Sequence, residues 1–531
     1  MSLDAARLDR LASLAATLAG SWGARARGLT SSGQERAVLR LFGVNGVDAA
    51  GRPLAGEVVS RYVGRDPGQL GRGIALPFAM GLLEYDLAPQ RLALDVASGA
   101  VDLGLEAELL REPGRRLLAE AEATRLAAAA VARIDANRTA RTELLALFGD
   151  PGRPWIATTL VEPVVDEALG EARRRVGEGL DLLRVEVPLG RELTDRLRAA
   201  GVEWPAWPST EPGWPKAAGQ DDNEPAPTGS QRGLARIRRA LDEAAADRRG
   251  YVRLASAAPA LMAAEQSIVA GFERIDVVDA DVMAEIVAGS VDPDRAITDH
   301  VFAHRLLRRA GGTLLLGAGP LVVGPDLASG VPSNAASRSG RALALQLIGV
   351  ALARGDGLPP HQILLGALPL WLTDEPHPAT RAAAEVALRR ALLPEHPLTF
   401  EEPVTTPHFA AAWPFVLAGV LPAAEPAAMV LRRPTDGSML AGVRASRAAS
   451  GVAAQLAAAY EGRGLSGDAA AHAGAVAEAA IHTLERLDGA GWRSVLGDAP
   501  GGGERLRLGG DAVVERTEAF DVLGPSLARA G

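Results

Sequence analysis

The sequence predicts an α/β protein, a (β/α)₈ barrel with helical extensions at both ends. Between Arg153 and Leu421 one pattern occurs eight times: a short apolar run, a break of Gly, Pro or acidic residues, and a stretch of helical periodicity. The apolar runs are continuous rather than alternating, which is typical of strands buried on both faces of a parallel sheet. Eight such units in about 270 residues match the size of a closed eight-stranded barrel.

The eight predicted strands are the apolar runs themselves. In chain order they are Trp155–Leu160, Leu182–Val187, Tyr251–Ala255, Ile275–Val278, Thr313–Leu316, Ile363–Leu368, Leu398–Glu401 and Phe415–Leu421. Barrels of this kind place their chemistry at the C-terminal ends of the strands, so we look for functional residues there.

The predicted barrel covers residues 151–425, between two helical regions. Residues 1–150 form a helical accessory region, with helices expected at Asp4–Leu18, Glu35–Phe42 and Leu105–Ile134. Pro113-Gly114 should divide the last of these in two. Residues 426–531 form a helical C-terminal region, with helices at Val443–Tyr460 and Gly467–Leu487 and a Gly-rich tail.

Composition excludes several classes of protein. Hydrophobic residues make up 48% of the chain and charged residues 23%, as in ordinary globular proteins. No apolar stretch reaches the roughly 20 residues that a bilayer crossing needs, and the N-terminus lacks the pattern of a secretory signal. Zero cysteines exclude disulfides, thiolate metal sites and iron–sulfur clusters. The net charge of −9 favours neither nucleic acid nor anionic membrane, and we expect a cytoplasmic protein.

The single lysine, Lys216, lies beside an unusual Trp- and Pro-rich segment. A Schiff base to pyridoxal phosphate needs a lysine amine, and in this chain only Lys216 could supply it. The segment Trp204–Pro215 contains three Trp-Pro pairs and follows the second predicted strand, so it should overhang the C-terminal face of the barrel. It is either a surface loop pinned by aromatic anchors or a lid or docking surface for a partner.

An acidic group accompanies the fourth predicted strand. Asp276, Asp279 and Asp281 belong to this strand and its end, and Glu285 follows. Acidic side chains at a strand end could bind an amine or a metal, or they could simply complement the dipole of the next helix.

Three further motifs carry weaker signals. His300 and His304 share one helix face, but no third metal ligand is evident, and we expect this face to be solvated. Gly317-Ala318-Gly319 could let backbone amides approach a phosphate, although a tight turn explains it better. Glu401-Glu402 close the seventh strand as acids of the barrel rim.

Beyond these motifs, the whole chain resembles the large (alpha) subunit of the lysine 5,6-aminomutases. The matching segments are colinear and nearly span the chain. They are Glu35–Asp48, Pro53-Leu54, Val58-Val59, Leu70–Leu103, Asn137-Arg138, Arg141, Gly149-Asp150, Tyr251–Leu254, Glu273–Val277, Arg295, Asp299, Phe302, Gly509-Gly510 and Val513-Val514.

The resemblance implies a TIM barrel that binds pyridoxal phosphate and moves the terminal amino group of lysine or a related amino acid by radical chemistry. It also implies a small (beta) partner subunit, which carries adenosylcobalamin and supplies the Schiff-base lysine. A large subunit with one lysine is compatible with that arrangement.

The sequence departs from this family where the cofactor should bind. The arginine and serine after the second strand align with Val187 and Glu192, and the serine after the third strand aligns with Pro259. The ring-stacking tyrosine aligns with Ala284, and the aspartate after the fifth strand with Pro320. Candidate cofactor-binding residues that remain are Arg184, Arg191 and Asp281.

Two functions are therefore open. The chain is either a divergent large subunit of a cobalamin-dependent aminomutase, or a non-catalytic paralogue that keeps the barrel and the subunit interface for assembly or regulation. No catalytic residue and no metal site is assigned.

Overall fold

In a computed structural model of the chain, the described residues run from 4 to 523, with the following exceptions: 47, 49–52, 65, 67, 161–164, 186–229, 259–260, 288–290, 318–333, 369–376, 403–426, 433–438, 458–464, 493–512 and 518–519.

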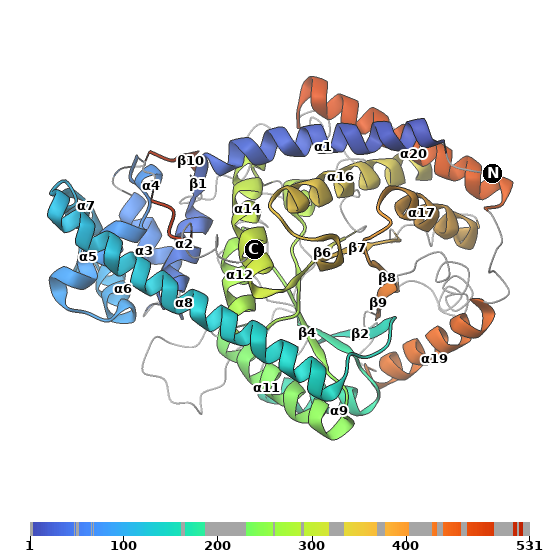
Figure 1. The fold of residues 1–531 in the computed structure, drawn as a ribbon, viewed down its shortest axis with the longest axis horizontal. Helices are drawn as coiled ribbons and strands as arrows, with labels where there is room; N and C mark the ends of the chain where they lie inside the picture. Colours follow the sequence, from blue (N-terminus) through green and yellow to red (C-terminus); the bar gives the residue numbers. More distant parts are fainter. Residues whose placement is uncertain are drawn as a thin grey trace.

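Eight parallel strands close into a barrel in chain order, which confirms the predicted fold (Figure 1). They are β2 (Trp155–Leu160), β3 (Leu182–Val185), β4 (Arg253–Ala257), β5 (Val277–Asp279), β6 (Thr313–Leu316), β7 (Ile363–Gly366), β8 (Leu398–Glu402) and β9 (Ala427–Arg432). The first strand pairs with the last, with Trp155 opposite Met429. Closure leaves no unpaired edge strand in the ring.

The eighth strand is the one that the sequence misplaces. It lies at Ala427–Arg432, beyond both the predicted run Phe415–Leu421 and the predicted end of the barrel at residue 425. Residues 415–421 lie outside the described part of the chain. The strand begins with Ala427 and Ala428. Alanine favours helix over strand, so the local sequence does not indicate a strand at this position.

Helices between successive strands cover the outside of the barrel (Figure 1). They are α9 (Val165–Gly177), α11 (Gln231–Arg248), α12 (Ala263–Phe272), α13 (Val282–Val287), α14 (Pro293–Ala310), α16 (Ala335–Gly355), the short 3₁₀ helix η2 (Pro360–Gln362) and α17 (Pro378–Leu392). The continuous apolar character of the strands follows from this covering, because their outward side chains pack on helices instead of facing water.

Alternate residues of the strands form two distinct cores. A small cluster fills the barrel interior and includes Trp155 and Ala157 of β2, Leu182 of β3 and Val277 of β5. The intervening residues point outward into a much larger cluster shared with the helices. This alternation identifies the side chains that reach the interior, since residues two apart on a strand share one face.

The N-terminal region is mostly helical. Its helices are α1 (Ala5–Arg27), α2 (Ser32–Leu41), α3 (Leu54–Val63), α4 (Gly68–Arg72), α5 (Ala75–Tyr85), α6 (Pro89–Ser98), α7 (Leu103–Leu109) and α8 (Pro113–Phe148). Pro113 begins α8, which confirms the predicted division. Helices α2 to α8 share a second core, whereas α1 lies along the barrel (Figure 1). The long α8 leads from the accessory core to the first strand.

After the barrel, α19 (Met439–Ala457) and α20 (Gly467–Ala490) confirm the two predicted C-terminal helices. Helix α20 packs against α16 and α1 (Figure 1). A short strand β10 (Val513–Glu515) pairs antiparallel with β1 (Leu29–Ser31), so the end of the chain returns to its beginning. None of the helices in the described residues is long and apolar enough to cross a membrane.

Candidate functional site

The C-terminal mouth of the barrel contains an arginine and an aspartate that point into the interior. Arg184 is two residues after Leu182, and Asp279 is two residues after Val277, and both apolar residues belong to the interior cluster. The Arg184 Nη2 and Asp279 Oδ2 atoms are 2.5 Å apart. Arg184, which the sequence places within the second predicted strand, lies near the end of β3 and already forms an ion pair.

Among the described acids of this mouth, Asp281 has the pKa that is shifted furthest from its ordinary value. It lies between β5 and α13, is 8% exposed, and accepts hydrogen bonds from the amides of Met283 (2.9 Å), Ala284 (3.3 Å) and Gly317 (3.1 Å). Burial is the main cause that raises its pKa from 3.8 to about 6, and the nearby charge of Asp279 adds to the increase, whereas the amide hydrogen bonds lower it. Asp281 can therefore change its protonation near neutral pH.

Glu285 and His300 form a buried pair behind Asp281. Glu285 Oε1 is 3.2 Å from His300 Nε2, and Glu285 Oε2 accepts a hydrogen bond from the Leu261 amide at 3.4 Å. Both side chains are almost fully buried. One turn later, His304 Nδ1 is 2.9 Å from Asp356 Oδ2, and burial lowers the pKa of His304.

The prediction of a solvated helix face for the two histidines is wrong. His300 and His304 are each 1% exposed. Their helix, α14, packs against α1, α8, α12 and α16, so little of its surface faces water. The described residues contain no group of three potential metal ligands, and each histidine instead meets one carboxylate.

Asp276 belongs to the opposite end of the barrel. The strand β5 begins only at Val277, so Asp276 precedes it instead of closing it. Its carboxylate accepts hydrogen bonds from the Tyr251 hydroxyl and the Leu254 amide, both at 2.9 Å. Arg141 and Arg238 lie 2.9 and 3.2 Å away as ion-pair partners. Asp276 is therefore a structural anchor, separate from the acids at the mouth.

Gln346, a buried glutamine that the sequence does not single out, supports the C-terminal mouth of the barrel. Gln346 of α16 donates its side-chain amide to the carbonyls of Gly317 (3.2 Å) and Gly366 (2.9 Å), at the ends of β6 and β7. Its Oε1 accepts a hydrogen bond from Arg389 Nε at 2.9 Å. Gln346 also donates to the Leu316 carbonyl at 3.4 Å, and the peptide that joins Leu316 to Gly317 is the one whose N–H donates to Asp281. The one signal in the sequence is a lone polar residue within the apolar run Ala342–Val350.

Several predicted site residues fall outside the described part of the chain. These are Val187, Arg191, Glu192, Lys216, Pro259, Pro320 and the Trp204–Pro215 segment. Ala284 is described, and it lies partly exposed in the first turn of α13. Of the predicted Gly317–Gly319 turn, only Gly317 is described, and its amide contacts Asp281. Glu401 and Glu402 belong to β8, but their side chains are not among those described.

The mouth therefore presents opposite charges near one another. Arg184 can bind a carboxylate, while Asp279 and Asp281 can accept hydrogen bonds from an ammonium group. Such an arrangement is suited to an amino acid, which carries both groups.

Comparison with known proteins supports a relation over most of the chain. Residues 1–409 match the family described as the D-lysine 5,6-aminomutase TIM-barrel domain of the alpha subunit. The lysine 5,6-aminomutase alpha subunit of Fusobacterium nucleatum is 26% identical over 375 residues, which cover 70% of this chain and 65% of that protein. The corresponding protein of Acetoanaerobium sticklandii is 24% identical over 370 residues, with the same two coverages.

The matched region thus spans 65% of the length of these curated relatives. Among solved structures, Yersinia pestis DHPS with a pterine-sulfa conjugate aligns with a TM-score of 0.33 and 14% identity, covering 57% of this chain and 94% of that one.

Proposed function

Because the chain belongs to the family of the D-lysine 5,6-aminomutase alpha-subunit TIM-barrel domain, we propose that it is the large subunit of an aminomutase that acts on lysine or a related diamino acid. The observation that supports this most directly is the pairing of Arg184 with acids at the barrel mouth. Arg184 would bind the substrate carboxylate, and Asp279 and Asp281 would bind an ammonium group.

Asp281 has a second use in this proposal. A carboxyl group with a pKa of about 6 can hold or release a proton near neutral pH. When ionised it attracts a substrate ammonium, and when protonated it can donate a hydrogen bond to a neutral amine. Glu285 and His300 lie behind it, and Gln346 keeps the Gly317 amide in place against it.

The cofactors implied by the family are adenosylcobalamin, which the beta subunit would carry, and pyridoxal phosphate. The described residues do not fit the phosphate of pyridoxal phosphate. A phosphate carries more negative charge than a carboxylate, and the acids Asp279 and Asp281 lie near Arg184 without an ammonium group to offset them. Ala284 also offers no ring on which a pyridine could stack. We therefore derive no step through this cofactor, and we expect no aldimine on Lys216.

The partner proposed for the chain is the cobalamin-binding beta subunit, in a cytoplasmic complex. The Trp204–Pro215 segment remains our predicted docking surface, since its three Trp-Pro pairs would form a stiff apolar patch that favours burial.

The poor fit to phosphate favours one second candidate, a non-catalytic paralogue that binds the beta subunit without turnover. The two functions differ in what the complete complex does with substrate, so one experiment separates them.

The experiment combines the chain with the beta subunit, both cofactors and lysine of either configuration. NMR would follow transfer of the terminal amino group to the neighbouring carbon, and calorimetry would measure lysine binding. Turnover would support the aminomutase, and we expect Asp281→Asn to weaken lysine binding about tenfold or more through loss of a charge-assisted hydrogen bond. The control Asp9→Asn removes an exposed acid of α1 and should change nothing.

Assembly with the beta subunit without turnover would support the paralogue instead. Lysine binding that survives Asp281→Asn unchanged would remove Asp281 from the proposed site.

A further inference from the structure

A buried arginine is joined to an acid of the barrel mouth by a chain of hydrogen bonds. Arg389 of α17 donates from Nε to Gln346 Oε1 at 2.9 Å, and Gln346 Nε2 donates to the Leu316 carbonyl at 3.4 Å. The same peptide group carries the Gly317 N–H, which donates to Asp281 Oδ2 at 3.1 Å. The chain therefore runs from one cation to one carboxyl group through two amides.

The side chain of Gln346 is held in place by further contacts and is shielded from water. Its Nε2 also donates to the carbonyls of Gly317 at 3.2 Å and Gly366 at 2.9 Å, so it bridges the ends of β6 and β7. Gln346 is 1% exposed and Arg389 is fully buried, so water does not compete for these hydrogen bonds. An amide that accepts a hydrogen bond in such a site becomes a stronger donor, by about 10–30% per bond.

Glu385 fixes the orientation of Arg389. Glu385 Oε2 is 2.6 Å from Arg389 Nη1, one turn away in α17, and both side chains are fully buried. Burial raises the pKa of Glu385, but its contacts with His472 and the charge of Arg389 lower the pKa by more, so the carboxylate is ionised at neutral pH. With Nη1 held by Glu385, the Nε–H of the same guanidinium is directed to Gln346.

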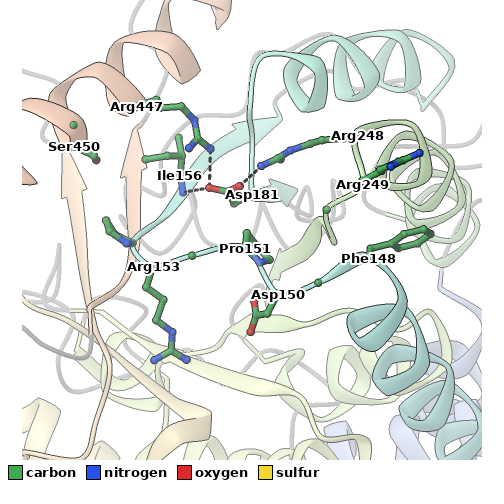
Figure 2. Close-up of a pocket in the computed structure, with 15 residues that line it drawn as sticks. Phe148, Asp150, Pro151, Arg153, Ile156, Asp181, Arg248, Arg249, Arg447 and Ser450 are labelled. Carbon is green, nitrogen blue, oxygen red and sulfur yellow. Dashed lines mark hydrogen bonds and ion pairs between the residues drawn. The ribbon is translucent and has the colours of Figure 1, made fainter.

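The opposite end of the barrel shows arginines that reach an acid directly. There Asp181 accepts hydrogen bonds from the Ile156 amide at 3.0 Å, from Arg248 at 2.6 Å and from Arg447 at 3.0 Å (Figure 2). Among the described residues, no arginine lies within ion-pair distance of Asp281. The buried cation at the mouth is thus linked to its acid through amide groups.

We propose that Arg389 is a positioning residue for Asp281, because through Gln346 it orients and polarises the peptide whose N–H donates to this acid. The inference rests on the proposed function, in which Asp281 binds the substrate ammonium, and it names the residue that tunes the ionisation of that acid. A hydrogen bond to a charged group favours the charged form. A stronger Gly317 donor therefore keeps more of Asp281 ionised at neutral pH and able to bind an ammonium group.

Other charged or titratable groups belong to the same mouth, and they come from β3, β5, α13 and α14. They are Arg184, Asp279, Glu285 and His300. Burial is the main cause that raises the pKa of Asp281, the charge of Asp279 adds to it, and the charge of His300 opposes it. Arg389 contacts none of these four groups in the described part of the chain, so a change confined to Arg389 leaves them in place.

The test measures the pKa of Asp281 in the full chain without substrate, so it depends on neither turnover nor lysine binding. NMR of the chain labelled with ¹³C at its aspartate carboxyl groups follows the Asp281 signal, which is assigned by its absence in Asp281→Asn. Arg389→Lys keeps a positive charge beside Glu385 but removes the planar fork that also donates to Gln346. We expect the pKa of Asp281 to rise by about 0.3 or more.

Gln346→Met breaks the same chain at its centre and covers the case in which Arg389→Lys does not fold. Methionine is similar in length to glutamine and has no N–H donor, so the pKa of Asp281 should again rise by about 0.3 or more. In the Gln346→Met background, Arg389→Lys should raise this pKa no further, because the link between the two groups is already broken.

Arg175→Lys is the matched control. Arg175 is also fully buried and is paired with a glutamate one turn away, Glu171, at 2.8 Å. Its other contacts are with Thr158 and Thr159 of β2, and it has no hydrogen bond to Gln346. This variant should therefore leave the pKa of Asp281 unchanged.

The proposal is overturned if the pKa of Asp281 is the same in the parent chain, Arg389→Lys and Gln346→Met, or if Arg175→Lys raises it as much. It is also overturned if Arg389→Lys raises the pKa equally with and without Gln346, because the effect would then bypass this residue. The expected rise in pKa in a chain that binds no lysine would support the role of Arg389 and contradict the proposed function.

Discussion

The two ends of the barrel bury carboxylates in opposite ways. At the N-terminal end, Asp181 and Asp276 are each met by two arginines and by a backbone amide. At the mouth, Asp281 receives three backbone amides, and Arg184 is paired with Asp279 instead.

The difference separates a structural acid from a functional one. A buried carboxylate surrounded by guanidinium groups holds the segments that carry them together. A buried carboxylate held mainly by amides, beside another acid, keeps a pKa of about 6 and can exchange protons or accept a ligand cation. The same residue type thus serves the scaffold at one end and chemistry at the other.

We expect the largest loss of stability from a substitution at Asp276. Asp276→Asn removes the charge that compensates Arg141 and Arg238, and removing one partner of a buried ion pair costs about 3–5 kcal/mol. Denaturant unfolding of the full chain measures this loss. Asp279→Asn at the mouth, where the acid is more exposed, serves as control and should cost about 1 kcal/mol. Equal losses at the two positions would remove the distinction between the ends.

The second largest expected effect is a dependence of stability on pH that is caused by Asp281. Its pKa rises on folding from 3.8 to about 6, so the folded state binds more protons than the unfolded state between these values. The contribution of Asp281 to the free energy of unfolding therefore falls as pH rises from about 4 to about 6, by roughly 3 kcal/mol in total. Above pH 6 this contribution becomes constant.

Asp281→Asn should abolish this dependence. The stability of the parent chain relative to the variant should thus increase as pH is lowered from 7 to 4, in unfolding midpoints measured at each pH. Asp9→Asn, an exposed substitution, should show no such trend. A parent-to-variant difference that does not change with pH would mean that Asp281 titrates normally.

The smallest predicted effect concerns the support of the mouth. Gln346→Leu leaves the Arg389 Nε donor and the Gly317 and Gly366 carbonyls without their partner, at a cost of about 2 kcal/mol in unfolding free energy. Gln362→Leu, near the start of β7, is the matched control, because its Oε1 has no hydrogen-bond partner among the described residues. If the two variants lose the same stability, Gln346 does not hold the mouth.

The sequence predicts the barrel well because strand burial leaves a local signal. Seven of the predicted runs overlap strands, since a strand covered on both faces must be apolar along its whole length. The eighth strand leaves no such signal, because its alanines favour helix.

The site is harder to predict from the sequence. Arg184 and Asp281 can be assigned to strand ends, but their partners come from distant segments: Gly317 lies 36 residues from Asp281, and Asp279 lies 95 residues from Arg184. The histidines show the same limit, because burial of α14 depends on helices that neither motif nor spacing places against it.

The pairing of β1 with β10 has a consequence for how the chain is made. Leu29 lies opposite Glu515, a separation of 486 residues (515 − 29 = 486). At a synthesis rate of about 5–20 residues per second, β1 waits roughly 25–100 seconds on the ribosome before its partner exists. During that time the backbone edge of Leu29–Ser31 is open to other strands. A chain that terminates before Val513 lacks the strand that pairs with this edge, so truncation there should leave the edge of Leu29–Ser31 unpaired.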